Sequence, residues 1–140
     1  MQFHHLSTEV RQRFTTDEPH LQNVKFSDFI IDGYSLHKRL EKYELVPSLG
    51  DGTKEYQEEM ISYFLLQKPH PLLWYRAPIL VCPECADLGC GFISAKLDRR
   101  DNLVIWSDFY KDNYQSKINI GPFYFRWDQY CEVIKSTLTN

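Results

Sequence analysis

The chain has 140 residues, of which 43% are hydrophobic and 15% aromatic, so it is long enough and apolar enough to fold around one core. Its 19 acidic and 16 basic residues give a formal net charge of −3, which lacks the basic excess of nucleic-acid-binding domains, and we expect no nucleic-acid ligand. No apolar run approaches the roughly 18 residues that span a bilayer, so we expect no membrane partner either.

The N-terminal residues predict a short helix over 7–14, with Ser7 placed to cap it and Pro19 following the segment that ends it. We interpret residues 1–20 as an appendage to the domain. The first six residues lack the basic start and apolar stretch of a secretory signal, which predicts a cytoplasmic location.

The next hundred residues contain helix and strand signals in turn. Clustered apolar side chains predict a strand over 21–31. Ser35 is placed to cap a short helix, and Thr53 is placed to cap a second, longer one that ends at Pro69. The proline-rich connection that follows contains large apolar side chains, which would be costly to leave in water.

The second half of the chain predicts a sheet. A strand over 79–81 is followed by one over 91–97, where apolar and polar residues alternate so that Ser94 and Lys96 face water. The turn at 99–102 is too short for a parallel crossover and therefore predicts a β-hairpin.

The C-terminal part predicts a polar loop over 111–119, a short strand over 120–125 and a terminal helix. The helix has an apolar stripe formed by Trp127, Cys131, Ile134 and Leu138. The chain is therefore expected to be a single α+β domain over 1–140, in which about three helices pack on one antiparallel sheet.

Three cysteines lie close together in the sequence, at Cys82, Cys85 and Cys90. Two thiolates separated by two residues can hold one tetrahedral zinc ion, and a structural zinc usually takes four protein ligands. No residue has diagnostic spacing for the fourth position, for which the candidates are Cys131, His4, His5, His20, His37 and His70.

Two other interpretations of the cysteines stay open. They are ordinary reduced thiols at strand ends, or they are a redox pair. A thioredoxin-like pair needs a helix directly after the strand, and Gly89 and Gly91 follow too soon for a long one. The same glycines lack the third glycine of a dinucleotide fingerprint. We therefore expect no cofactor unless the cysteines hold zinc.

An acidic and aromatic stretch follows the predicted hairpin. Its side chains are of the types that anchor protein interfaces, and they are Trp106, Asp108, Tyr110, Asp112 and Tyr114. The alternative is that Trp106 and Phe109 cap the core while the aspartates are solvated turn residues.

Five segments carry a resemblance to a known group of proteins, and they are DFIIDG at 28–33, LVPSLG at 45–50, CPECADLGCG at 82–91, WSDF at 106–109 and IGPF at 120–123. Through them the chain from about residue 26 to residue 134 resembles a family of small bacterial proteins whose activity is not settled. Some members carry the label oxidoreductase, although no cofactor motif is present here. Ala86 stands where the family pattern would have glycine.

In size and mild acidity the chain is also similar to bacterial immunity proteins, which neutralise a toxin by binding it. No spacing indicates a catalytic triad or dyad, so we expect a protein-binding module, specifically an immunity protein with a cognate toxin as partner, rather than an enzyme. The alternative function is a zinc-binding or thiol-redox protein that uses Cys82, Cys85 and Cys90.

Overall fold

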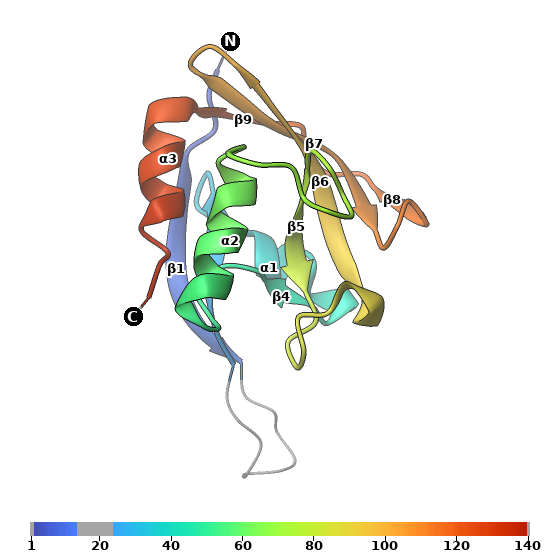
Figure 1. Cartoon of the computed structure of the whole chain (residues 1–140). Helices are drawn as coiled ribbons and strands as arrows, with labels where there is room; N and C mark the ends of the chain where they lie inside the picture. Colours follow the sequence, from blue (N-terminus) through green and yellow to red (C-terminus); the bar gives the residue numbers. More distant parts are fainter. Residues whose placement is uncertain (1, 14–23, 140) are drawn as a thin grey trace.

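The computed structural model describes residues 2–13 and 24–139. In this part of the chain it places nine strands, three α-helices and two short 3₁₀ helices in one α+β domain (Figure 1). The strands are β1 (Leu6–Arg13), β2 (Val24–Ile31), β3 (Tyr34–Ser35), β4 (Val46–Pro47), β5 (Arg76–Val81), β6 (Phe92–Arg100), β7 (Leu103–Lys111), β8 (Ser116–Ile118) and β9 (Phe123–Arg126). The helices are α1 (Leu36–Arg39), η1 (Glu41–Tyr43), α2 (Lys54–Phe64), η2 (Leu88–Cys90) and α3 (Trp127–Lys135).

The N-terminal segment belongs to the sheet structure. β1 pairs antiparallel with β2 along its whole length, from Leu6 opposite Ile31 to Arg13 opposite Val24, and Leu6 is fully buried. The predicted helix over 7–14 is therefore wrong, and so is the interpretation of the described part of 1–20 as an appendage. Pairing with a distant strand has overridden a weak local helix signal, while residues 14–20 lie outside the described ranges.

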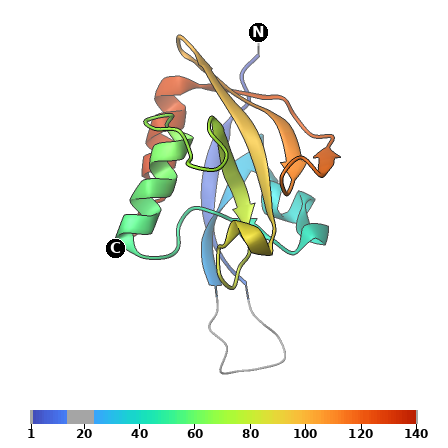
Figure 2. The ribbon, with the colours of Figure 1, turned by 45° about the vertical axis from the view of Figure 1, so that its right-hand side comes forward.

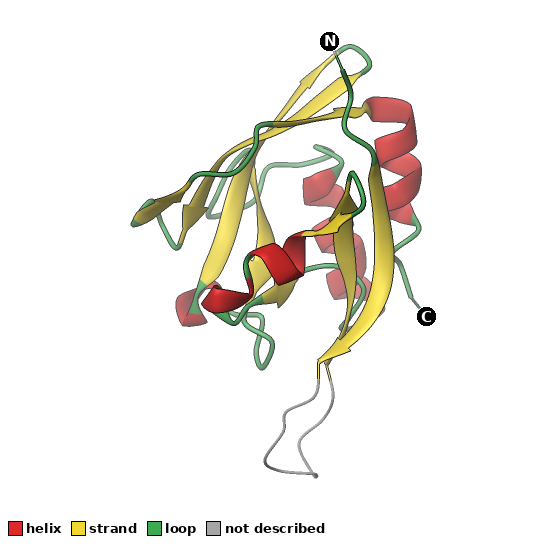
Figure 3. Ribbon diagram, turned by 180° about the vertical axis from the view of Figure 1, so that it is seen from behind, coloured by secondary structure: helices red, strands yellow, loops and turns green. Residues whose placement is uncertain are grey.

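Two sheets surround the core, where the sequence predicted one. One sheet has the order β1-β2-β3, and the other has the order β4-β5-β6-β7-β8, with β9 also pairing with β7. Two backbone hydrogen bonds join the sheets through residues that flank their strands. Ser27 N–H in β2 donates to the carbonyl of Leu49, just after β4, at 2.8 Å, and the N–H of His4, just before β1, donates to the Tyr124 carbonyl in β9 at 2.7 Å. The sheets thus wrap around a shared interior (Figures 2 and 3).

The predicted hairpin is confirmed, because β6 and β7 pair antiparallel and Arg100 stands opposite Leu103. The prediction that Ser94 and Lys96 face water is correct for only one of the two residues. Lys96 is exposed, but Ser94 is 2% exposed because the guanidinium of Arg76 lies over it and donates to its hydroxyl at 3.0 Å. A neighbouring strand therefore covers a position that alternation alone assigned to solvent.

Both predicted helix caps are confirmed. Ser35 Oγ accepts from the Lys38 N–H at 3.0 Å and Thr53 Oγ1 accepts from the Tyr56 N–H at 3.1 Å. α2 and α3 stand side by side, with α1 on the other side of the molecule (Figure 2). In the C-terminal region, α3 ends before Leu138, so that residue is not on its stripe, and the predicted polar loop contains the short strand β8.

The interior is rich in aromatic rings. Trp106 on β7 is fully buried, and its ring contacts Phe29 on β2, Phe64 on α2 and Phe125 on β9, with centroid separations of 5.2, 5.8 and 5.2 Å. One side chain therefore joins both sheets and a helix. Within the described ranges, no helix has the length and apolar character needed to cross a membrane.

Candidate metal centre

The three clustered cysteines lie on the connection between two paired strands. β5 ends at Val81, which stands opposite Phe92 at the start of β6, so the strand pairing brings the two ends of the connection together. Cys82 directly follows β5, Cys85 lies in the turn after it, and Cys90 ends the 3₁₀ helix η2. The sheet therefore positions the first and last thiols of the connection near each other.

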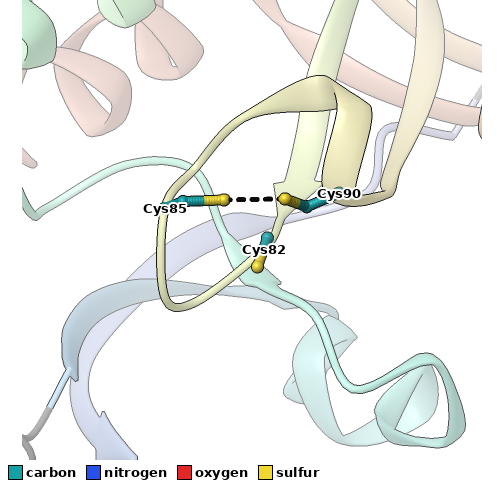
Figure 4. Close-up of side chains that lie close together, drawn as sticks. All are labelled: Cys82, Cys85 and Cys90. Atoms are coloured by element: carbon teal, nitrogen blue, oxygen red, sulfur yellow. Dashed lines mark hydrogen bonds between the residues drawn. The ribbon is translucent and has the colours of Figure 1, made fainter.

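The three sulfur atoms all lie within 4.8 Å of one another. The Cys85 and Cys90 sulfurs point toward each other at 3.0 Å, and Cys82 lies beside them (Figure 4). All three cysteines are free thiols. Because Zn–S bonds are about 2.3 Å, sulfurs around one tetrahedral ion are about 3.8 Å apart, so a single ion is within reach of all three.

Backbone amides around the cluster favour the ionised form of the first thiol. Donation from the Glu84 N–H is the largest cause that lowers the pKa of Cys82, and the Cys85 N–H acts in the same direction against the opposing effect of burial. The Asp87 N–H donates to the Cys85 sulfur at 3.4 Å. Such N–H···S contacts stabilise a thiolate, which is the form that binds a metal.

The turn that aims these amides contains a residue in the left-handed region. Ala86 has φ +56°, and its N–H donates to the Cys82 carbonyl at 3.0 Å. Glycine adopts this conformation without a Cβ penalty, which explains why a glycine would suit the position.

The third thiol resists ionisation while its neighbours are charged. Hydrogen bonding with Cys85, followed by the charges of Cys85, raises the pKa of Cys90 to about 11. A bound cation would remove this repulsion, because metal binding favours thiolates over thiols. The three thiols are thus electrostatically suited to bind a positive ion.

No fourth protein ligand joins the three sulfurs within the described ranges. Among the described residues, the group that could hold an ion consists of these three cysteines and includes no histidine or carboxylate. His37 packs on Phe26, and Cys131 packs against the core on α3. Of the other candidates, His20 lies outside the described residues.

The predicted partner-binding residues do not all reach the surface. Trp106 is fully buried, so its assignment as an interface residue is wrong; it lies on the core face of β7. The guanidinium of Arg76 lies between Asp108, at 3.3 Å, and the rings of Tyr110 and Tyr114, whose centroids are 5.5 and 5.0 Å away. Asp108, Tyr110 and Tyr114, which were all predicted as partner-binding residues, therefore form one group around Arg76.

The fifth predicted residue, Asp112, lies next to this group. Its carboxylate accepts from Lys111 Nζ at 2.8 Å and from the Phe92 N–H at 3.2 Å. These hydrogen bonds, with Lys111 first among the causes, lower its pKa. Asp112 thus remains ionised and holds the end of β7 against the start of β6.

An exposed apolar group lies beside these residues and was not predicted as a site. Leu72 and Trp74 are 72% and 69% exposed, and together with Tyr114 they line a small depression. The expectation that such large side chains would be buried is wrong for these two. The run of four large apolar residues after Pro71, from Leu72 to Tyr75, was the only sequence signal for this surface.

Comparison of the chain with protein-family models, curated proteins and solved structures found no match in any of the three.

Proposed function

We propose that this chain is a metal-binding protein in which Cys82, Cys85 and Cys90 hold one zinc ion as thiolates. The observation that supports it is the approach of three free thiols to within 4.8 Å of one another. Zinc suits a sulfur-rich donor set and needs no redox chemistry. The reducing interior of a cell, where we propose the protein resides, would keep the thiols available.

The place of the cluster supports a structural contribution from the metal. The residues 82–91 form a long surface connection whose order depends on turns and one 3₁₀ helix, and its ends are held by β5 and β6. Cys82, Cys85 and Cys90 are spread along this connection, so an ion bound to all three would hold it in one conformation. The free energy of metal binding would then add to the free energy of folding.

A redox function is less well supported by the same geometry. Cys85 and Cys90 lie close enough to form a disulfide after small movements. However, neither Cys82 nor Cys85 lies at the start of an α-helix, where the helix dipole would activate a thiol. The amides that favour the Cys82 thiolate serve metal binding equally well.

Metal analysis tests the proposal. Protein purified without chelator is expected to contain about one equivalent of zinc, and less than about a tenth of an equivalent would contradict the proposal. Cobalt substitution is expected to produce the near-ultraviolet charge-transfer band of thiolate ligands. Cys90→Ser should lose metal affinity, whereas Cys131→Ser is the matched control and should keep it.

We also propose that the chain binds a protein partner, as an immunity protein binds its toxin, through the exposed group of Leu72, Trp74, Tyr75 and Tyr114. A specific observation favours this second function: Leu72, Trp74 and Tyr75 are exposed on the connection between α2 and β5. His70 Nδ1 accepts from the Leu72 and Leu73 N–H groups at 3.0 and 3.2 Å, which holds the loop. Clustered exposed aromatic side chains are typical of interface anchors.

Co-expression with the product of the adjacent gene, followed by affinity purification, tests this second function. Trp74→Ala and Tyr114→Ala are expected to weaken the complex at least tenfold, as is usual for interface anchors. Tyr34→Ala removes a different exposed aromatic ring and is the matched control. Equal binding by all three variants, or no complex with wild-type protein, would count against the proposed surface.

A further inference from the structure

β1 is a long strand at the edge of its sheet. It pairs with β2 along all eight of its residues in one unbroken register, whereas β3 at the opposite edge of the same sheet has only two residues (Figure 3). Proteins usually shorten, bend or cover their edge strands, because a long regular edge presents backbone N–H and C=O groups to another strand. The edge of β1 is therefore a surface on which a further strand could pair.

Two hydrogen bonds show which residues of β1 direct their backbone groups toward this edge. The Asp32 N–H donates to the His5 carbonyl at 2.9 Å, so the backbone of His5 faces β2. The carbonyl of the next residue, Leu6, faces the other way and accepts from Gln129 Nε2 on α3 at 2.8 Å. Because the two directions alternate along an antiparallel strand, every even-numbered residue of β1 directs its backbone groups away from β2.

The even-numbered residues beyond Leu6 lie on an accessible part of the strand. They are Thr8, Val10 and Gln12. Val10 is 69% exposed and Gln12 is also exposed, whereas Leu6 is fully buried. A strand added here would pair with the outward N–H and C=O groups of these three residues and would cover the apolar side chain of Val10.

The charges on either side of Val10 favour a second copy of the same strand, in one register. When two β1 strands pair antiparallel about a two-fold axis at Val10, Glu9 of each copy stands opposite Arg11 of the other. The same axis sets Thr8 opposite Gln12, so the residues with outward backbone groups meet one another. An axis at Glu9 or at Arg11 would instead set like charges directly opposite each other, which destabilises strand pairing.

The Arg11 side chain is already held on the face where these charges would meet. Its guanidinium lies 2.9 Å from the buried Asp28 carboxylate on β2 and 3.2 Å from Glu9 of the same chain. The Arg11 and Glu9 side chains are 40% and 61% exposed, and a guanidinium has five N–H donors, so Arg11 can also contact Glu9 of a second copy. We infer that β1 is the interface of a symmetric homodimer, in which two copies join their three-stranded sheets edge to edge at Val10. The inference is independent of the proposed metal site and of the proposed partner-binding surface.

Sedimentation velocity on the full chain over a range of concentrations tests the inference. Wild-type protein is expected to have the mass of two chains at about 100 µM and to dissociate on dilution. Val10→Pro removes the N–H at the centre of the interface, and because that N–H points away from β2, the pairing with β2 is kept. We expect this variant to be monomeric. Val10→Thr keeps both the N–H and the branched side chain, and as the matched control it should remain a dimer.

The register is tested by a change of charge. Glu9→Lys sets a lysine opposite Arg11 of the other copy, and it is expected to raise the Kd of the dimer at least about threefold. Glu41→Lys makes the same change at an exposed position on η1, away from β1, and should leave the Kd unchanged.

Three results would overturn the inference. Wild-type protein that has the mass of one chain up to about 500 µM would exclude the dimer. A dimer of Val10→Pro as tight as that of wild type would exclude the edge of β1 as its interface, and an unchanged Kd in Glu9→Lys would exclude the register. Circular dichroism checks that the variants are folded. If Val10→Pro does not fold, Val10→Lys replaces it, because it keeps every backbone N–H and sets two like charges opposite each other at the axis.

Discussion

The indole N–H of Trp106 donates to the Tyr130 hydroxyl at 3.1 Å, and that hydroxyl donates in turn to the Phe64 carbonyl at 2.7 Å. Both side chains are fully buried. Burial raises the pKa of Tyr130 well above its ordinary value, so the hydroxyl keeps its proton and remains a donor. This chain of hydrogen bonds connects β7, α3 and the end of α2.

Tyr130→Phe removes the middle of that chain. The variant leaves the Trp106 N–H without an acceptor and the Phe64 carbonyl without this donor, and we expect the free energy of unfolding to fall by about 1–3 kcal/mol. Urea denaturation measures the change. Tyr124→Phe, at a half-buried ring, is the control and should change stability by less than about 0.5 kcal/mol. If Tyr130→Phe and Tyr124→Phe lower the free energy of unfolding by similar amounts, the hydrogen bonds of Tyr130 do not contribute to stability.

Arg76→Lys tests the buried guanidinium. Arg76 donates to the Ser94 hydroxyl, the Ser94 carbonyl, and both the carboxylate and the carbonyl of Asp108. An ammonium group cannot reproduce this planar fork, so we expect a loss of about 1–3 kcal/mol in the free energy of unfolding.

Asp108→Asn is the matched variant for the same contact. The Asp108 side chain is 41% exposed, so solvent screens its ion pair, and the loss should stay below about 1 kcal/mol. Asparagine also tolerates the positive φ of +58° at this position. A larger loss for Asp108→Asn than for Arg76→Lys in thermal or urea unfolding would contradict this account.

We predict that the free energy of unfolding depends on pH through the protonation of His70. Burial lowers the pKa of His70, with Glu59 opposing, and its neutral Nδ1 accepts two backbone N–H groups. The unfolded chain therefore binds the proton more readily, and the free energy of unfolding should decrease as pH falls from about 6.5 through the lowered folded-state pKa.

His70→Asn isolates this contribution, because the amide oxygen can accept the same N–H groups in an Asx turn but does not titrate. The stability of the variant relative to wild type should therefore rise as pH is lowered from about 7 to about 5. Denaturant titrations at several pH values measure the difference. Parallel profiles for the two proteins would exclude a contribution from His70.

Metal removal is predicted to lower thermal stability. If zinc binds only the folded chain, free metal at about 1,000 times its Kd stabilises the protein by about 4 kcal/mol, and a chelator should remove that gain. Cys85→Ser is expected to be insensitive to chelator, because one of the three ligands is missing. Wild-type protein with the same Tm in zinc and in chelator would contradict a stabilising metal.

Local signals in the sequence were sufficient for several elements and for the cysteine cluster. The caps at Ser35 and Thr53 depend on the next three residues alone, and the β6–β7 hairpin depends on a short turn between alternating strands. The spacing of Cys82 and Cys85 likewise places two thiols within reach of one ion in almost any turn.

The tertiary structure decided everything that depends on contacts between distant residues. The pairing of β1 with β2 made a strand of the predicted helix, and packing between two sheets buried Trp106. The same packing placed Val46 opposite Val81, next to Cys82, although neither neighbourhood contains a sequence signal for the other. Such contacts are set by the burial of the whole apolar surface at once, which no short stretch of sequence encodes by itself.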